Sequence, residues 1–371
     1  MKIAKVEAVR VSMPTRVRYE EAGGTYTKFV RSLVIRLHAD DGTVGTGDVH
    51  ESVPGYTAET LDTMHAVVVH AYAPALVGTD LDSPEALHRL LVRTRRGNGF
   101  ARCAVEMAAF DALARSRGQR ICALLGGPVR TCLQLVGGIG IDAPDAMAER
   151  ARAMVGAGYR TIKLKVGTGD PRQDLDRVRV VRRAIGDGIP IRVDANAGYA
   201  PEQAFMVARG LADLGIEHFE QPVAAENFDA MARLVRLGAV PIMADESVHT
   251  AADALRIVRE GAADGIKIKI SKVGGYIEAR RIIDIAEAAG VKVILGNGIC
   301  SSIEAASEVH LACAFDHVHP VTEMVGPAKL AGDIARAPFD LTGGTITLPE
   351  GPGHGMELSE ARLREFTIAA A

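Results

Sequence analysis

Three acidic residues end short apolar runs at nearly equal intervals in the second half of the chain: Asp194, Glu220 and Asp245. Such runs are typical of buried strands, and each interval fits a strand, a helix and two turns. The carboxylates should then converge at the ends of consecutive parallel strands. Carboxylate oxygens on rigid elements suit octahedral Mg²⁺, and the His or Cys ligands typical of zinc are absent from these ends. The spacing predicts a hard-metal site.

Lysines flank these acids on both sides. Lys163 and Lys165 alternate with apolar residues, so both should point the same way from one strand, which inside a barrel is inward. Buried lysines are costly unless anions meet them. Crowding by a second cation and a nearby metal lowers the pKa of an ammonium, which makes the neutral amine available as a base. Lys269 should stand across the metal from Lys165, with Lys267 and Lys272 as alternatives for that role.

These residue types together indicate one kind of chemistry. A substrate carboxylate binds Mg²⁺, a lysine removes or adds the proton on the neighbouring carbon, and the metal stabilises the enediolate that forms.

The rest of the chain indicates which elements position these side chains. Strands are expected near residues 133–140, 161–166, 190–195, 216–221, 241–245, 264–270, 291–297 and 317–323. Helical stretches such as 201–214 and 276–289 fill the gaps. This alternation predicts a closed parallel barrel with its active site at the carboxyl ends of the strands, and an open doubly wound sheet is the alternative. No Gly-x-Gly-x-x-Gly follows the first strand, so a dinucleotide site has no support.

The N-terminal part has a different pattern. Residues 1–50 are rich in strand signals, with a hairpin turn at 40–42 and a polar segment at 15–28 that we expect to be a mobile loop, and 58–118 have a helical period. We therefore expect an α+β capping domain over 1–125 and a barrel over 126–330. Residues 331–371 should fold back onto the first module.

Composition excludes several functions. The formal net charge of −3 offers no basic field for nucleic acid, and no apolar run is long enough for a membrane span. The five cysteines include no Cys-x-x-Cys pair, which favours free thiols and a cytoplasmic location.

Several motifs resemble the enolase superfamily, and within it the muconate-lactonizing branch of the mandelate racemase/muconate lactonizing enzyme family. They are Ala-Ala-Phe-Asp at 108–111, Leu-Leu-Gly-Gly at 124–127, Lys-Leu-Lys at 163–165, Val-Asp-Ala-Asn at 193–196, Glu-Gln-Pro at 220–222, Ala-Asp-Glu-Ser at 244–247 and Lys-Ile-Ser-Lys-Val-Gly-Gly at 269–275. The resemblance implies a modified TIM barrel, (β/α)₇β, with an N-terminal α+β capping domain. It also implies Mg²⁺, or Mn²⁺, on the three acids, with Lys165 and Lys269 as the acid/base residues.

The resemblance also implies roles for neighbouring residues. Lys163 should bind the substrate carboxylate and tune Lys165, and Asn196 and Glu246 should lie beside the metal ligands. Glu323, in the Thr-Glu context typical of muconate cycloisomerases, is either a substrate contact or a salt-bridged structural residue.

Strand seven lacks the His that is typical of the mandelate racemase branch, and Asn297 stands at its end as a candidate substrate contact. Specificity is expected from the loops of the capping domain. Their candidate substrate contacts are Tyr26, Lys28, His50 and Tyr56.

The expected reaction is lactonising cycloisomerisation of a small carboxylate. Racemisation or epimerisation of an N-acyl amino acid, a dipeptide or another amino-acid derivative is the close alternative, and syn-dehydration is the third. A non-enzymatic scaffold is disfavoured because the three acids and both lysines are all present. By analogy with similar barrels, we expect a homo-oligomer.

Overall fold

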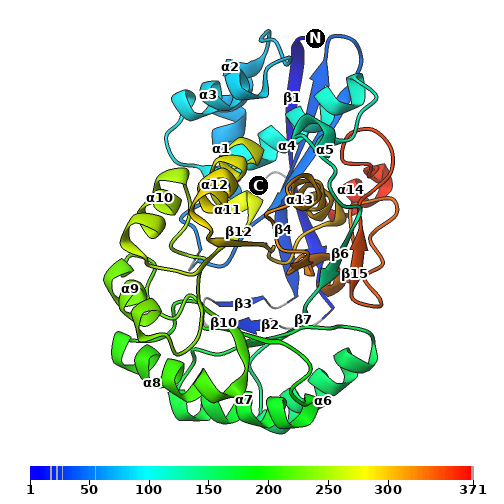
Figure 1. Cartoon of the computed structure of the whole chain (residues 1–371). Helices are drawn as coiled ribbons and strands as arrows, with labels where there is room; N and C mark the ends of the chain where they lie inside the picture. The colour runs from blue at the N-terminus through cyan, green and yellow to red at the C-terminus, as the bar shows by residue number, and fades with distance from the viewer. Residues whose placement is uncertain (17–18, 22–23, 27, 55, 369–371) are drawn as a thin grey trace.

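The chain forms a curled parallel sheet with helices outside it, joined to an N-terminal sheet with its own helices (Figure 1). The computed structural model describes residues 1–368 apart from 17–18, 22–23, 27 and 55, and describes only the backbone of 19–21 and 24–26. The helices of residues 144–260 lie along the outside of the parallel strands, and the helices of residues 61–94 lie at the opposite end of the molecule.

The N-terminal unit is built on a three-stranded antiparallel sheet. In it, β1 (Ile3–Pro14) pairs with β4 (Phe29–Ala39), which pairs with β5 (Val44–His50). Its helices are α1 (Leu61–Val67), a π-helical turn (Val68–Tyr72), α2 (Ala73–Leu76), α3 (Pro84–Thr94), α4 (Gly99–Ser116) and α5 (Ile121–Leu124). The buried α4 approaches β5 so closely that a Cβ at Gly47 would lie 2.1 Å from the carbonyl oxygen of Ala104. A side chain at Gly47 would therefore push the helix away from the sheet.

The polar segment that we expected to be a loop contains a short antiparallel hairpin. Its strands are β2 (Tyr19–Glu21) and β3 (Gly24–Tyr26). Strands this short show no clear period of two, so the pattern of the sequence did not reveal them.

Seven strands form the parallel sheet, in the order β13-β12-β11-β10-β9-β8-β7. They are β7 (Gly137–Ile139), β8 (Ile162–Lys165), β9 (Ile191–Asp194), β10 (Ile216–Glu220), β11 (Ile242–Ala244), β12 (Gly265–Ile268) and β13 (Lys292–Leu295). The helices between and after them are α6 (Pro144–Gly156), α7 (Pro171–Ile185), α8 (Pro201–Leu211) with a 3₁₀ turn (Ala212–Leu214), α9 (Phe228–Leu237), α10 (Ala251–Glu260), α11 (Ile270–Val273), α12 (Tyr276–Ala289) and α13 (Ser302–Ala314). Strands β8 to β12 are buried almost throughout, as expected where helices cover a parallel sheet.

The first and last predicted barrel strands differ from expectation. The first divides at Val136 into β6 (Cys132–Leu135) and β7, and only β7 joins the seven-stranded sheet. The last is β14 (Val321–Thr322), which pairs with β6 and not with that sheet. Isolated bridges from Val293 to Val318 and from Gly296 to Glu323 still hold the β14 segment beside β13. The last strand therefore lies between β13 and β6 as the barrel requires, but it is joined to β13 by isolated bridges and not by a continuous ladder.

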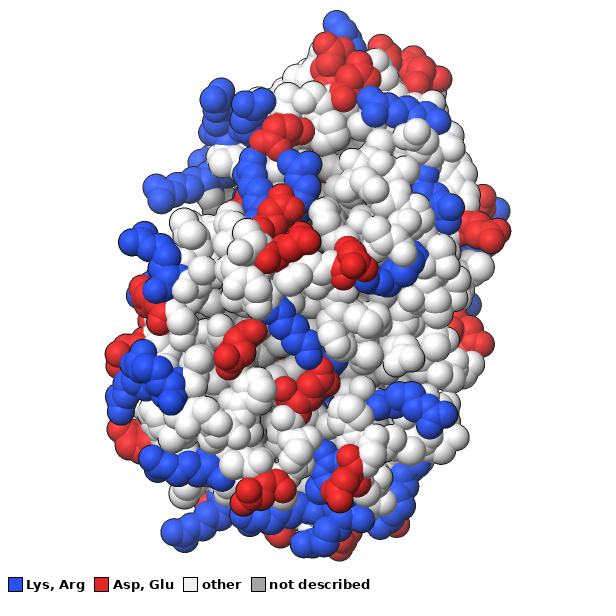
Figure 2. All heavy atoms as spheres, in the orientation of Figure 1, with Lys and Arg blue, Asp and Glu red and all other residues white. Residues whose placement is uncertain are grey.

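The C-terminal segment contacts both parts of the molecule. After a 3₁₀ turn (Gly326–Lys329), β15 (Thr345–Thr347) pairs with β6, whereas α14 (Glu360–Phe366) packs beside β1 and Thr367 bridges to Val11. Among the described residues, no helix is long and apolar enough to cross a membrane. Acidic and basic side chains are interspersed on the face that Figure 2 shows.

Candidate active site

The three predicted metal ligands stand at the carboxyl edge of neighbouring strands. Asp194 ends β9, Glu220 ends β10 and pairs with Asp194 in the register, and Asp245 directly follows β11. All three are fully buried. The sequence interval thus corresponds to consecutive parallel strands, as predicted.

Lysines from β8 bind the first two of these acids. The Nζ atom of Lys163 lies 2.7 Å from Oδ2 of Asp194 and 2.8 Å from Oε1 of Glu220. Lys165, two residues on, places its Nζ 2.9 Å from the same Asp194 oxygen and 2.6 Å from Oδ1 of Asn196. Both lysines therefore point into the barrel mouth, which is the direction predicted from their period of two.

A second group of cations surrounds Asp245. The Nζ atoms of Lys269 and Lys272 each lie 2.7 Å from one of its carboxylate oxygens. The hydroxyl of Tyr56, from the N-terminal unit, donates a 3.1 Å hydrogen bond to Oδ2 of Asp245, and the Lys269 ammonium sits 3.8 Å from the centre of the Tyr56 ring. Lys269 and Lys165 both line a pocket at the carboxyl ends of the strands, which is described below. The buried Lys272 does not line this pocket.

The charges on these groups follow from their pairing. Burial favours a neutral carboxyl group, yet Lys163 and Lys267 hold the pKa of Glu220 well below its usual range, and Lys269 and Lys272 do the same for Asp245. Glu220 and Asp245 are therefore ionised.

The carboxylates control the pKa of the lysines that meet them. Burial alone would lower the pKa of Lys163, but Asp194 and Glu220 outweigh it and hold the pKa well above its usual value. In the same way Asp245 raises the pKa of Lys269 against the effect of burial. The lower pKa expected for Lys163 and Lys165 depends on a metal ion beside them and stays a prediction.

The predicted neighbours of the metal ligands form one hydrogen-bonded group. The side-chain amide of Asn196 donates to the Tyr56 hydroxyl at 2.7 Å and to Oε1 of Glu246 at 3.0 Å, while its oxygen accepts from Lys165. Asn196 has a positive φ of 42°, which is uncommon for a residue other than glycine and marks a site held in place by its surroundings. Burial and the charge of Asp245 raise the pKa of Glu246 to about 8.

Most of the predicted substrate contacts line one pocket at the carboxyl ends of the strands. Its lining includes Lys163, Lys165, Asp194, Lys269, His50, Tyr56, Asn297, Glu323, Phe100 and Lys329. Lys28 is exposed and is not part of this lining, so the structure does not bring it to the site. The side chain of Tyr26 lies outside the described residues.

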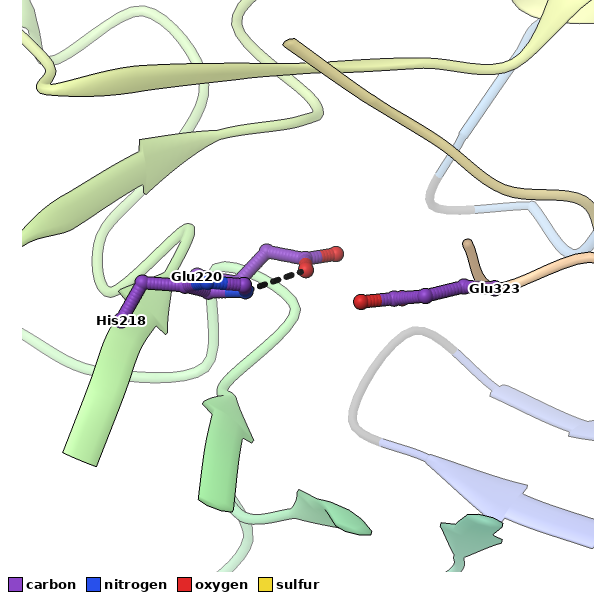
Figure 3. A group of neighbouring side chains, drawn as sticks. All are labelled: His218, Glu220 and Glu323. Carbon is purple, nitrogen blue, oxygen red and sulfur yellow. Dashed lines mark ion pairs between the residues drawn. The ribbon is translucent and has the colours of Figure 1, made fainter. Parts of the chain in front are cut away.

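A different trio of donors lies close enough to hold a metal ion. Among the described residues, His218, Glu220 and Glu323 have donor atoms within 4.8 Å of one another, and Figure 3 shows Glu323 pointing toward the other two from the opposite side. The carboxylate oxygens of Asp194, Glu220 and Asp245 do not form a group that meets this distance.

Cations already neutralise the carboxylates of the His218 trio. Lys163 and Lys267 both form ion pairs with Glu220 and Glu323, and Arg192 adds a third positive charge 3.0 Å from Glu323. Burial lowers the pKa of His218 to about 4, so its imidazole is neutral. The predicted acids are also paired with lysines and share Glu220 with this trio, so ion pairing alone does not distinguish the two groups.

The sequence analysis did not predict that Arg192 and Lys267 form ion pairs with Glu323. Arg192 is fully buried on β9 and pairs with both Glu217 and Glu323, and Lys267 is fully buried on β12. Arg192 alternates with Val193 and precedes Asp194 by two, so a period of two would have placed it on the same inward face as that acid. Its ion pair with Glu323 could not be predicted, because that contact depends on where β14 lies.

Models of known families match both parts of the chain. The "Mandelate racemase / muconate lactonizing enzyme, N-terminal domain" matches residues 4–126, and the "Enolase C-terminal domain-like" model matches residues 146–362. The chain belongs to the mandelate racemase/muconate lactonizing enzyme family. This confirms the resemblance inferred from the motifs.

Relatives within this family are similar over nearly the whole chain. N-succinyl-L-Arg/Lys racemase of Bacillus cereus is 32% identical, over 99% of this chain and 98% of its own length. Muconate cycloisomerase 1 of Rhodococcus opacus is also 32% identical, over 99% of each.

Solved structures agree with the sequence comparison. The crystal structure of the N-succinyl Arg/Lys racemase from Bacillus cereus superposes with a TM-score of 0.95 at 30% identity, covering 100% of this chain and 99% of that one. The muconate lactonizing enzyme from Pseudomonas fluorescens, complexed with muconolactone, gives 0.95 at 32% identity over 99% of each. The predicted fold class, a modified TIM barrel with a cap, is confirmed.

Proposed function

We propose that this chain is an isomerase that transfers the proton on the carbon next to the carboxylate of a small acid, with Lys165 and Lys269 as the proton-transfer groups. The observation that carries the proposal is the placement of these lysines. Both line one pocket, yet Lys165 ends β8 and Lys269 follows β12, with β9, β10 and β11 between them in the sheet. Each meets a different carboxylate, which supports an approach of the two amines from opposite sides of the pocket.

The other residues of the pocket fit an anionic substrate. Lys163 is positioned to bind the substrate carboxylate, because its ammonium is held in the charged state by Asp194 and Glu220. The charge of Lys163 also stabilises the enediolate that forms when the proton leaves. Phe100 and Val136 give the same pocket apolar surface, and an apolar surrounding strengthens these electrostatic interactions.

The acids Asp194, Glu220 and Asp245 are the residues that would hold Mg²⁺, or Mn²⁺. Their donor set fits such an ion, because three buried carboxyl groups on adjacent strand ends provide hard oxygen ligands. When bound, the metal supplies positive charge that neutralises these acids and polarises the substrate carboxylate. A lysine whose carboxylate partner is neutralised has a lower pKa, and it can then accept a proton.

The reaction we favour is lactonising cycloisomerisation of a muconate-type acid. It is supported by the similarity to muconate cycloisomerase 1 over nearly the whole chain. Racemisation or epimerisation of an amino-acid derivative is the second candidate. It is favoured by the two lysines on opposite sides of the pocket, since one can remove a proton from one face of a carbon while the other returns it to the opposite face.

A substrate screen in D₂O tests the proposal. The purified chain with Mg²⁺ is given muconates, N-acylated amino acids, dipeptides and hydroxyprolines in separate reactions. A racemase or epimerase introduces deuterium at the reacting carbon of both stereoisomers, whereas a cycloisomerase forms a lactone deuterated on one face. Neither turnover nor deuterium incorporation with any of these acids would contradict the proposal.

A further inference from the structure

A second cavity adjoins the active-site pocket and shares two of its lining residues, Tyr56 and Phe100. Most of its remaining lining comes from α3 and the start of α4 in the N-terminal unit, and from α11, α12 and the residues before α10 in the barrel. The volume of this cavity is about 750 Å³. The proton transfer proposed for Lys165 and Lys269 makes no use of it.

Positive charge dominates the lining of this second cavity. The lining contains six arginine and lysine side chains and two acidic side chains, Glu59 and Glu278. Glu59 is engaged by the start of α4, where it accepts the backbone N–H groups of Phe100 and Ala101. Glu278 forms an ion pair with Arg281. The acids of the cavity therefore leave most of its positive charge unpaired.

Three arginines of this lining have no partner among the described residues. The side chains of Arg89, Arg93 and Arg96 form no hydrogen bond or ion pair with any residue that the structure describes. Arg89 and Arg93 lie four residues apart on α3, and Arg96 follows shortly after the end of this helix. Arginine keeps its positive charge in proteins, and like charges four residues apart on a helix repel each other. An anion bound between the guanidinium groups would relieve this repulsion.

A buried arginine adds to the positive charge at the cavity. Arg102 is 9% exposed and also lines it. Among the described residues, its guanidinium group donates to three backbone carbonyl oxygens, those of Gly97, Val273 and Gly274, and to no carboxylate. Neutral carbonyl groups fix the position of the guanidinium but do not cancel its charge. The charge of Arg102 therefore also attracts an anion into the cavity.

The size and the apolar part of the lining indicate what kind of anion fits. A volume of about 750 Å³ is far more than a single inorganic ion needs. Val92 is 42% exposed, shares the face of α3 that carries Arg89 and Arg93, and lines the cavity together with Ala58 and Phe100. This apolar surface suits the carbon skeleton of an organic ligand. Guanidinium groups bind carboxylate and phosphate groups alike through paired hydrogen bonds.

We propose that this cavity is a second binding site, which takes a small organic anion with two or more carboxylate or phosphate groups. Arg89, Arg93 and Arg96 bind the oxyanion groups of the ligand, and Arg102 contributes positive charge from the wall. The site is separate from the pocket that holds Lys165 and Lys269. The inference therefore does not depend on the reaction proposed for that pocket, and its test needs no turnover.

Calorimetric titration of the full chain tests the site, without Mg²⁺ because polyanions bind that ion. Citrate is the tricarboxylate probe, and fructose 1,6-bisphosphate is the probe with phosphate groups. At least one of them should bind the wild type, and the one that binds more tightly gives the class of oxyanion. In a triple variant with Arg89→Gln, Arg93→Gln and Arg96→Gln, the binding should be weaker by about tenfold or more, because charged hydrogen bonds are lost. Circular dichroism verifies that the variant is folded.

A matched control removes the same charge from another helix. Arg172, Arg179 and Arg183 are exposed on α7, and the last two are also four residues apart. Their replacement by glutamine changes the net charge equally and should leave the affinity of the probe unchanged. Inorganic phosphate, with one oxyanion group, should bind the wild type at least about tenfold more weakly than the better probe.

Three results would overturn the proposal. Equal affinity of the two triple variants would mean that the anion binds in the active-site pocket or through net charge alone. Binding of inorganic phosphate as tight as that of the better probe would mean that the site does not recognise two oxyanion groups. Absence of binding by both citrate and fructose 1,6-bisphosphate would mean that the three arginines are a solvated surface.

Discussion

The hydroxyl of Tyr56 lies 3.1 Å from Oδ2 of Asp245 and connects the N-terminal unit to the end of β11. The same hydroxyl accepts a hydrogen bond from Asn196, which follows β9. One side chain of the cap thus fixes the positions of a predicted metal ligand and of a neighbour of another ligand. The position of the N-terminal unit and the alignment of the carboxylates are therefore physically linked.

Replacing Tyr56 by Phe tests this link. The ring and its contact with the Lys269 ammonium are retained, but both hydrogen bonds of the hydroxyl are lost. Because one of them is to a charged group, we expect kcat/KM to fall by about 10- to 100-fold. Steady-state kinetics measure this, with circular dichroism to verify the fold. Unchanged kinetics would show that the cap contact does not align the site.

Titration of Mg²⁺ by calorimetry distinguishes the two candidate metal groups. Asp245→Asn should weaken binding roughly tenfold or more, because one of the anionic ligands becomes neutral. His218→Gln should leave the affinity unchanged, since His218 belongs to the other candidate group and is not one of the three predicted acids. Asp316→Asn, at an exposed ion pair with Arg130, is the matched control. The reverse pattern, with only His218→Gln affected, would mean that the ion binds at the His218 trio and not at the three predicted acids.

Glu323 should be important for stability. It compensates the charges of Lys163, Lys267 and Arg192, and these cations hold its pKa well below the usual range against the effect of burial. Glu323→Gln leaves uncompensated positive charge in the interior, so the free energy of unfolding should fall by about 3–5 kcal/mol. Urea denaturation measures this.

The control for Glu323 is Glu357→Gln, which removes an exposed ion pair with Arg336. It should change the free energy of unfolding by less than about 1 kcal/mol. Equal, small effects of the two substitutions would refute the structural importance of the Glu323 network.

His310 should make the fold sensitive to mild acid. Burial lowers the pKa of its imidazole to about 3, and its Nδ1 accepts the backbone N–H of Cys122. The folded pKa is below the unfolded value of about 6.5, so the folded state binds fewer protons and stability is lost as the pH falls below about 6.5. Between pH 7 and pH 5 this group should contribute a loss of up to about 2 kcal/mol.

Urea denaturation at the two pH values measures the effect. His310→Gln should show a smaller loss than the wild type, whereas His70→Gln, at an exposed position, should show the same loss. Equal losses in the wild type and His310→Gln would mean that His310 is not the responsible group.

The sequence was sufficient to predict the core of the site. Because β9, β10 and β11 are short, buried and followed by acids, their apolar runs and spacing alone predict that Asp194, Glu220 and Asp245 stand on neighbouring strand ends. The alternation of Lys163 and Lys165 predicts their common direction for the same local reason. Local periodicity is therefore enough to predict which side chains of one strand point to the same face of the sheet.

Contacts between segments that are far apart in the chain could not be predicted from local periodicity. The pairing of Glu323 with Arg192 depends on β14, which has only two residues and pairs with β6. The hydrogen bond from Tyr56 and the hold of Glu304 on His50 depend on how the N-terminal unit sits on the barrel. No periodic pattern encodes these placements, since they arise from packing between elements that are far apart in the chain.

The central claim is that Lys165 and Lys269 carry the reacting proton, and deuterium exchange tests it most directly. With the acid that the screen identifies, incorporation of deuterium in D₂O is followed by NMR for the wild type, Lys165→Met, Lys269→Met and the control Lys292→Met, which changes a surface lysine at the start of β13. Lys165→Met should lower the exchange rate by at least about 100-fold, and the control should exchange like the wild type. Lys269→Met should do the same in a racemase and retain exchange in a one-base cycloisomerase. Exchange at the wild-type rate in Lys165→Met would contradict the account.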